Sequence, residues 1–263
     1  MISLARRNGR PLRIGHRGAA LLAPENTLAA FRAALEVGVD LVEFDVFGLS
    51  NGELVVAHSN DLFEVSHGRA RGRIRHQTLE QLRESCPDLP TLSDALAWFA
   101  QDAPDLGVHI DLKERGLAAG VAEELRRYGL ADRAFASCFF HRELRELQRR
   151  APDVRTGVTF PRDVLRLHGR GRGASLLERA GLRALRWVTP WFVGPLLART
   201  DASALVLHHS VVSALVVQRA HARGVAVVAW TVDDPADLAR VDEAGVDAVV
   251  SNDPSIFVST LPS

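Results

Sequence analysis

The chain has 263 residues, of which 47% are hydrophobic and 24% are charged, and this balance is ordinary for a globular protein with a sizeable core. Its formal net charge is zero, so nothing in the composition indicates electrostatic capture of nucleic acid or of an anionic membrane. No transmembrane segment is predicted, because no apolar run approaches the roughly 18 residues that cross a bilayer. The N-terminus lacks the apolar core of a secretory signal, and Cys86 and Cys138 lack metal-binding spacing. We therefore expect a cytoplasmic protein with reduced thiols.

Apolar periodicity predicts strands that alternate with helices along most of the chain. The predicted strands are 13–16, 41–46, 107–113, 134–137, 154–160, 204–208, 225–230 and 248–251. The predicted helices are one that ends at Gly38 and those at 91–100, 117–128, 141–150, 211–222 and 235–244. Eight strands, with helices between most of them, in about 250 residues are typical of a (β/α)8 TIM barrel, an α/β fold. The structural alternative, a doubly wound open sheet, needs fewer strands and a glycine-rich turn after the first, and no G-x-G-x-x-G motif is present there.

Two stretches depart from this alternation. Asn51-Gly52 is typical of a tight hairpin and predicts a further strand at 53–58. Residues 59–85 are rich in Arg, Gly and His and show no clear period. We expect them to form an insertion over one end of a single barrel domain that spans residues 1–263.

Glu43 and Asp45 lie at alternate positions of one predicted strand, so their side chains share a face. Residues at the carboxyl ends of barrel strands line the active site, and Asp111 on the next barrel strand adds a third carboxylate. Three carboxylates on neighbouring strands predict a site for Mg²⁺ or Ca²⁺. The alternative is a structural ion network in which these acids pair with Arg17 and Lys113. Lys113 is the only lysine among 32 basic residues, which indicates a position that needs a compact charge rather than the arginine fork.

His16 and His58 are the candidates for proton transfer. A metal-assisted phosphodiester cleavage needs a base for the nucleophile, an acid for the leaving alkoxide and positive charge near the phosphoryl oxygens. Arg17 and Lys113 are the candidates for binding the phosphate. Trp230 is expected to pack at the barrel rim, or, if it is exposed, to stack on an apolar or polyol part of the substrate. Three further histidines are expected near the barrel without an assigned role: His109, His208 and His209.

Several short motifs follow one another along nearly the whole chain. They are Gly15-His16-Arg17-Gly18, Pro24-Glu25-Asn26-Thr27, Glu43-Phe44-Asp45-Val46, Asn51-Gly52 with Val55-Val56-Ala57-His58, Asp111-Leu112-Lys113, Trp230-Thr231-Val232-Asp233, and Gly245-Val246-Asp247 through Asp253-Pro254. In this order they resemble the glycerophosphodiester phosphodiesterase family, whose fold is a (β/α)8 barrel.

The resemblance implies an enzyme, a phosphoric diester hydrolase that converts a glycerophosphodiester into sn-glycerol 3-phosphate and an alcohol. It also implies roles for the residues that match the family motifs. They are general acid–base catalysis by His16 and His58, a divalent cation held by Glu43, Asp45 and the residue at 111, and phosphate contacts from Arg17 and Lys113. Residues 59–85 correspond to the small insertion that this family carries over the barrel mouth.

Two positions depart from the family pattern. The family usually has Glu where this chain has Asp111, and the side chain that is one methylene shorter is expected to change metal preference or affinity. The family usually has Asp directly after the second histidine, where this chain has Ser59 after His58. If that Asp orients the histidine, Ser59 or Asp61 has to substitute for it.

Residues 163–203 predict an Arg/Gly loop followed by helical pieces that Pro190 and Pro195 interrupt. Within them, Leu182 to Leu197 is strongly apolar and includes Trp187, Trp191 and Phe192. The favoured interpretation is a helix pair buried against the barrel. The alternative is an apolar surface that admits a lipid chain, so that the enzyme acts on lysophospholipids as a lysophospholipase D does. A third hypothesis is a barrel that binds phosphoesters without catalysis.

Overall fold

The computed structural model describes residues 1–161 and 176–257. In these residues, eight parallel strands form a closed barrel in the order β1-β9-β8-β7-β6-β5-β4-β2, and β2 pairs with β1 to close it. The barrel strands are β1 Leu12–Gly15, β2 Leu41–Gly48, β4 Gly107–Leu112, β5 Ala134–Cys138, β6 Arg155–Phe160, β7 Ala204–His208, β8 Ala226–Trp230 and β9 Ala248–Ser251. The predicted (β/α)8 barrel is confirmed.

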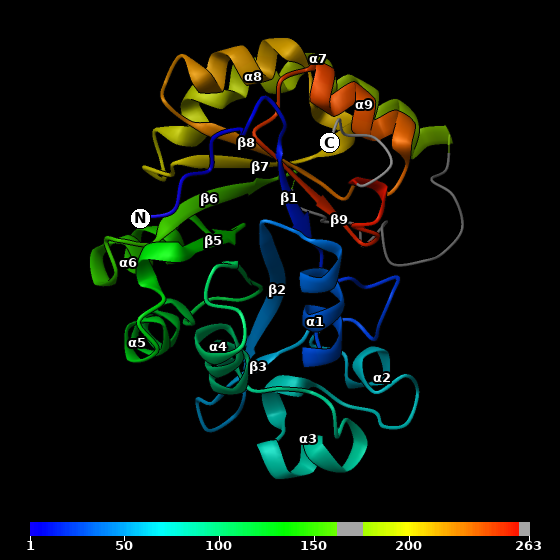
Figure 1. Ribbon diagram of the computed structural model, residues 1–263, viewed down its shortest axis with the longest axis vertical. Helices are drawn as coiled ribbons and strands as arrows, with labels where there is room; N and C mark the ends of the chain where they lie inside the picture. The colour runs from blue at the N-terminus through cyan, green and yellow to red at the C-terminus, as the bar shows by residue number, and fades with distance from the viewer. Residues whose placement is uncertain (162–175, 258–263) are drawn as a thin grey trace.

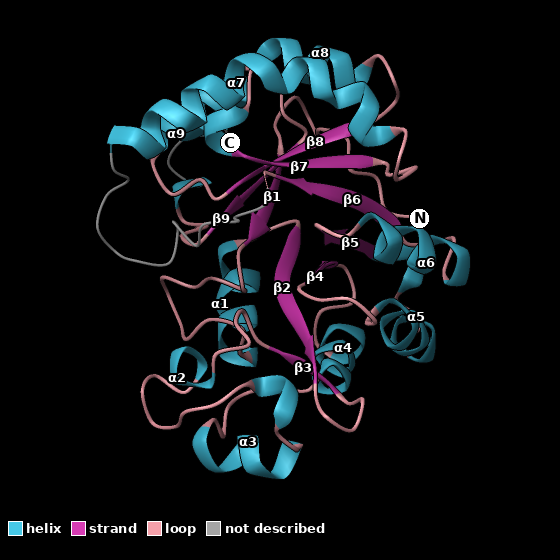
Figure 2. Cartoon of the chain, turned by 180° about the vertical axis from the view of Figure 1, so that it is seen from behind, coloured by secondary structure: helices cyan, strands magenta, loops and turns pink. Residues whose placement is uncertain are grey.

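Helices surround the barrel (Figure 1). They are α1 Leu28–Val37, α4 Leu92–Gln101, α5 Ala118–Arg127, α6 His141–Arg150, α7 Leu176–Leu197, α8 Ala214–His221 and α9 Pro235–Glu243, with short 3-10 turns η2 Ala131–Arg133 and η4 His209–Val211. Helices α7, α8 and α9 lie together on one side of the barrel, and both views place them far from α2 and α3 (Figure 2). None of the described helices is long and apolar enough to cross a bilayer.

The barrel wall separates two apolar layers. On β2, Val42, Phe44 and Val46 point outward and are buried against the helices, while Glu43 and Asp45 occupy the alternate, inward positions. Apolar side chains from all around the barrel fill its interior beneath the polar residues. They include Leu12, Ile14, Leu41, Phe135, Val206, Val228 and Val250. The inner layer therefore leaves only one end of the barrel open to polar chemistry.

The Asn51-Gly52 turn joins β2 to β3 Leu54–Val56, and the two strands pair antiparallel with Phe47 opposite Val55. The predicted hairpin is thus present, although its second strand is shorter than 53–58. Residues 59–85 contain α2 Leu62–Val65, the 3-10 turn η1 Ile74–His76 and α3 Leu79–Ser85. Their apolar side chains form a third cluster with β2 and β3, namely Leu62, Ile74 and Leu82 with Phe47, Leu49 and Val55.

Helix α7 corrects two expectations. It continues through Pro190 and Pro195 as one helix, although each proline lacks the N–H that would bond to the carbonyl four residues earlier. Its aromatic side chains are also not buried against the barrel: the exposed fractions of Trp187, Trp191 and Phe192 are 79%, 69% and 57%. The interpretation of a wholly buried helix pair is therefore wrong for this face of α7.

Candidate active site

A cavity of about 580 Å³ lies at the carboxyl ends of the barrel strands. Six of the eight residues predicted for the site line it: His16, Arg17, Glu43, Asp111, Lys113 and Trp230. Asp45 is fully buried beside them. His58 instead lines a smaller neighbouring cavity of about 160 Å³, and Glu25 lines both. The structure therefore brings seven of the predicted residues together and places His58 at the edge.

The three predicted metal ligands converge. One carboxylate oxygen each from Glu43, Asp45 and Asp111 lies within 4.8 Å of the others, because β2 and β4 pair with Asp45 directly opposite Asp111. Lys113 bridges two of them, with its Nζ atom 2.5 Å from Asp45 Oδ1 and 2.6 Å from Asp111 Oδ2. Burial alone would lower the pKa of Lys113, but Asp111 and Asp45 outweigh burial and raise it. The lysine therefore stays charged, and the ion network considered from the sequence is present.

This network does not balance its own charge. Four carboxylates face two cations in the described part of the cluster, namely Glu25, Glu43, Asp45 and Asp111 against Arg17 and Lys113. Burial and the neighbouring Asp45 raise the pKa of Glu43 well above its ordinary value, so the cluster resists ionising its fourth carboxylate without a further cation. With all four carboxylates ionised, two excess negative charges and an all-oxygen donor set fit a hard divalent cation such as Mg²⁺ or Ca²⁺.

His16 is held through one ring nitrogen. Its Nδ1 lies 2.6 Å from Asn252 Oδ1, and Asn252 Nδ2 donates to the Asp233 carboxylate at 2.7 Å. A carboxylate only accepts hydrogen bonds, so the amide must turn its NH₂ toward Asp233 and its oxygen toward the histidine. Neutral His16 therefore carries its proton on Nδ1 and leaves a lone pair on Nε2, which lies 3.8 Å from Glu43 Oε2.

Burial, reinforced by the charge of Arg17, lowers the pKa of His16 to about 4. A buried imidazole resists a charge because it has left the solvation of water. At neutral pH His16 is therefore a neutral imidazole with a free lone pair on Nε2, the form required of a general base.

His58 pairs with Glu25, a motif residue for which the sequence predicts no role. The Nδ1 atom of His58 lies 2.5 Å from Glu25 Oε1, and Glu25 Oε2 accepts a hydrogen bond from Arg17 at 2.7 Å. Burial would raise the pKa of Glu25, but the hydrogen bond from His58 and the charge of Arg17 lower it to about 2. Glu25 is thus an anion that links His58 to the rest of the cluster.

The expectation that Ser59 or Asp61 replaces the family's Asp beside His58 is therefore wrong. The Ser59 hydroxyl accepts the Asp61 backbone N–H, and the Asp61 carboxylate caps α2 by accepting the Phe63 N–H. Both side chains stabilise the local turn, while Glu25, distant in sequence, pairs with His58.

The turn after β1 positions further donors. Arg17 has a φ of +52° and Gly18 a φ of +87°, and this turn aims the Arg17 backbone N–H at Glu43 Oε2, 2.8 Å away. Asn26, also at positive φ, donates to Asp45 Oδ2 at 3.0 Å and accepts the Asp45 N–H at 3.2 Å. Thr27, the next residue, caps α1. The Pro24-Glu25-Asn26-Thr27 motif was therefore the signal for two site residues that residue types alone did not reveal.

Asp111 is supported from the next strand. Ser137 on β5 donates to Asp111 Oδ1 at 2.5 Å, and the same hydroxyl contacts His109 Nε2 at 2.9 Å. Because the Ser137 hydroxyl donates its single hydrogen to the carboxylate, it must accept a hydrogen bond from His109 Nε2. His109 and Ser137 together fix one oxygen of Asp111 and leave Oδ2 toward Lys113 and the cavity.

Trp230 forms part of the opposite wall of the cavity. Its Nε1 donates to the Val206 carbonyl at 3.3 Å, and its ring meets that of His208 edge-on at a centroid distance of 5.4 Å. Trp230 is half-buried: it packs at the rim and also lines the cavity.

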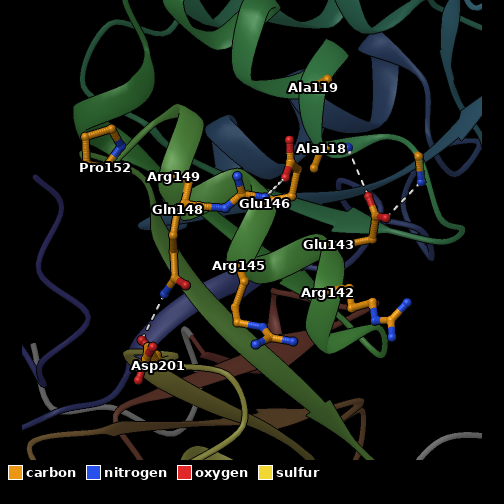
Figure 3. Close-up of a pocket in the computed structure, with 11 residues that line it drawn as sticks. Ala118, Ala119, Arg142, Glu143, Arg145, Glu146, Gln148, Arg149, Pro152 and Asp201 are labelled. Atoms are coloured by element: carbon orange, nitrogen blue, oxygen red, sulfur yellow. Dashed lines mark hydrogen bonds and ion pairs between the residues drawn. The ribbon is translucent and has the colours of Figure 1, made fainter.

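A larger concavity, of about 1010 Å³, lies outside the barrel between α5 and α6 (Figure 3). Glu143 accepts hydrogen bonds there from the backbone N–H groups of Gly116 and Ala118, at the start of α5. Glu146 pairs with Arg149. These contacts are explained by helix capping and a surface ion pair, and none of the predicted site residues lines this concavity.

Known proteins of one family resemble this chain in sequence and in fold. The chain matches the glycerophosphoryl diester phosphodiesterase family over residues 16–256. It is 27% identical to a glycerophosphodiester phosphodiesterase of Caldanaerobacter subterraneus subsp. tengcongensis, over 94% of this chain and 96% of the relative. An Oleispira antarctica phosphodiesterase, solved in complex with the product sn-glycerol-3-phosphate, is 25% identical and superposes with a TM-score of 0.76 over 97% of this chain and 98% of its own. A Thermotoga maritima glycerophosphodiester phosphodiesterase shares the fold, with 24% identity and a TM-score of 0.71 over 95% and 98% of the two chains.

Proposed function

This chain belongs to the glycerophosphoryl diester phosphodiesterase family and is a phosphoric diester hydrolase, and we propose that it hydrolyses glycerophosphodiesters to sn-glycerol 3-phosphate and an alcohol with the aid of a divalent cation. The observation that carries this proposal is that a neutral, oriented His16 lies beside three converging carboxylates at one cavity. The sn-glycerol-3-phosphate held by the O. antarctica phosphodiesterase supports the proposed product.

His16 serves as the general base. Its unprotonated Nε2 faces the cluster, where it takes the proton of the attacking water or hydroxyl as the new P–O bond forms. His58 serves as the general acid and gives a proton to the leaving alcohol as the old P–O bond breaks. The Glu25 carboxylate, already 2.5 Å from His58 Nδ1, stabilises the protonated imidazole before that transfer.

The phosphate is held by Arg17 and Lys113, which line the cavity beside the carboxylates. Glu43, Asp45 and Asp111 hold the cation, either Mg²⁺ or Ca²⁺, which when bound supplies further positive charge for the phosphoryl oxygens. Trp230 supports the glycerol or the leaving alcohol with its apolar face.

The test is hydrolysis of glycerophosphocholine by wild type and His16→Ala, in EDTA and after addition of Mg²⁺ or Ca²⁺. We expect wild type to lose activity in EDTA and regain it with one of the two ions. His16→Ala is expected to be at least about 100-fold slower at every ion concentration. Activity that survives both chelation and the substitution would rule out the proposed mechanism.

A second substrate class is favoured by one observation, the exposed aromatic residues of α7. An apolar surface of this kind supports a lysophospholipid as an alternative substrate, cleaved at the same bond by the same residues. Turnover of detergent-dispersed lysophosphatidylcholine, compared with that of glycerophosphocholine, distinguishes the two. Absence of any lysolipid turnover would eliminate this alternative. The non-catalytic barrel is not proposed, because the family match and the relatives identify the chain as a phosphoric diester hydrolase.

We also propose that residues 1–263 act as one barrel domain with an insertion at 59–85, and that the enzyme works in the cytoplasm, in glycerol and lipid metabolism. The packing of the insertion on β2 and β3 supports the first point. The cytoplasmic location is supported by the cysteines, Cys86 and Cys138, which are both buried and unpaired, and the metabolic role by the proposed substrate and product.

A further inference from the structure

Helix α7 has one buried face and one exposed apolar face. The buried face carries Thr189, Val193 and Leu197, whose exposed fractions are 3%, 1% and 7%. The opposite face carries two pairs of neighbours four residues apart, Trp187 with Trp191 and Val188 with Phe192, with exposed fractions of 79%, 69%, 42% and 57%. The helix is therefore anchored to the barrel along one side while its largest aromatic side chains face solvent.

Two arginines, one on α8 and one just after it, lie along α7 beside this exposed face. Arg219 donates to the Pro190 carbonyl at 2.7 Å and its guanidinium lies 4.1 Å from the centroid of the Trp191 ring. The Arg223 guanidinium lies beside Gly194. Leu215, one turn before Arg219 on α8, is also exposed, at 44%. We call Trp187, Val188, Trp191, Phe192 and Leu215 the α7–α8 patch.

The two helix segments that form the patch carry charge of one sign. Residues 184–197 and 214–223 contain three arginines, Arg186, Arg219 and Arg223, and no carboxylate. Helix α9, on the same side of the barrel (Figure 1), carries Asp237, Asp242 and Glu243, so the cationic region is confined to these two segments. The net charge of zero for the whole chain, which gave no sign of attraction to an anionic membrane, therefore conceals a local cationic region around exposed tryptophans.

We propose that the α7–α8 patch binds the surface of an anionic lipid bilayer. Tryptophan is suited to the lipid–water interface, because its ring is apolar and its N–H is polar. Arginines that flank it neutralise lipid phosphates, and each adds to the attraction. A second copy of the chain fits less well, because a two-fold interface would place the arginines of one patch against those of the other. Helix α7 also contacts η4, which directly follows the carboxyl end of β7 at the barrel mouth. A bilayer bound to the patch would therefore lie on the same side of the molecule as this part of the mouth.

The test is co-sedimentation of the full chain with vesicles of phosphatidylglycerol or of phosphatidylcholine. Wild type is expected to sediment with phosphatidylglycerol vesicles, more weakly with phosphatidylcholine, and less as salt increases. The double variant Trp187→Ser/Trp191→Ser is expected to bind more than about tenfold more weakly while hydrolysing soluble glycerophosphocholine at the wild-type rate, which also shows that it is folded. Phe63→Ser is the matched control, because Phe63 is an exposed aromatic with an arginine over its ring but lies on α2, far from α7 (Figure 1).

Three results would overturn the proposal. The first is a wild type that fails to sediment with phosphatidylglycerol vesicles. The second is equal binding by wild type and the double variant, or equal loss in the double variant and Phe63→Ser. The third, from sedimentation velocity without lipid, is a dimer of the wild type that the double variant abolishes, which would assign the patch to a second copy of the chain.

Discussion

Asn252 and Asp233 determine which nitrogen of His16 is free. The Asn252 backbone N–H also donates to Asp233, at 2.8 Å, so two hydrogen bonds from one residue fix the orientation of the amide. Neither residue needs to touch the substrate for this effect, since each acts through His16. They are positioning residues in the proposed mechanism.

Asn252→Ala is expected to lower kcat by about 10- to 100-fold and to change KM little, because His16 loses its tautomer and orientation while the phosphate contacts persist. Steady-state kinetics on glycerophosphocholine measure both parameters. Asn51→Ala is the control, since Asn51 is an exposed asparagine of the hairpin whose amide contacts a carboxylate, that of Glu53. If Asn252→Ala has wild-type kcat, the amide does not orient His16.

His109 links the site to stability. Burial lowers its pKa from an ordinary 6.5 to about 3, so between these values the unfolded chain binds a proton that the folded chain does not. The free energy of unfolding therefore falls as pH decreases below 6.5, by about 1.4 kcal/mol per pH unit for this residue. His16 acts in the same direction and Glu43, whose pKa is raised, in the opposite one.

His109→Gln should remove this contribution alone. Between pH 7 and pH 5, wild type is expected to lose about 2 kcal/mol more than the variant. Urea unfolding in EDTA at the two pH values measures the difference. Any loss of unfolding free energy that the substitution causes at both pH values alike cancels in this comparison. Equal losses in both proteins would mean that His109 titrates normally in the fold.

At the scale of elements, the turn between β1 and α1 shapes the site. Gly18 lies at a φ of +87°, and a Cβ there would meet the Ala30 backbone at 2.6 Å. Close packing of this turn on α1 is what holds the Arg17 N–H against Glu43. Gly38, which ends α1, has a similar φ of +85°, but a Cβ added there would meet no atom within 4 Å. Substitutions at these two glycines therefore distinguish the effect of backbone strain, present at both, from that of steric overlap, present only at Gly18.

Gly38→Ala is expected to cost about 1 kcal/mol of unfolding free energy, from the left-handed backbone alone, and to leave kcat unchanged. Gly18→Ala is expected to cost about 3 kcal/mol, because overlap with α1 adds to the strain, and to reduce kcat at the same time. Thermal unfolding and steady-state kinetics measure the two effects. Similar stability and activity in both variants would show that the turn tolerates displacement.

At the scale of the whole molecule, the barrel and the carboxylate cluster could be predicted because both follow from periodicity. Alternation along β2 and β4 places Glu43, Asp45 and Asp111 inward, and closure of the barrel brings the strand ends together. The pairing of His58 with Glu25 could not be predicted, because it depends on the conformations of two loops rather than on a repeat. The exposed face of α7 was predicted only as the alternative to a buried helix pair, because an apolar composition does not say which side of a helix meets the barrel.

The central claim is that His16 is the base and His58 the acid in hydrolysis of a glycerophosphodiester. The most direct measurement compares both alanine variants on two substrates, glycerophosphocholine and the p-nitrophenyl ester of glycerol 3-phosphate, with the required metal present. The p-nitrophenolate ion leaves without a proton, so it needs no general acid. We predict that His16→Ala slows both reactions by at least about 100-fold, and that His58→Ala slows only glycerophosphocholine hydrolysis to that extent. Equal losses on both substrates in His58→Ala would contradict the assignment of the acid, and a fully active His16→Ala would contradict the mechanism.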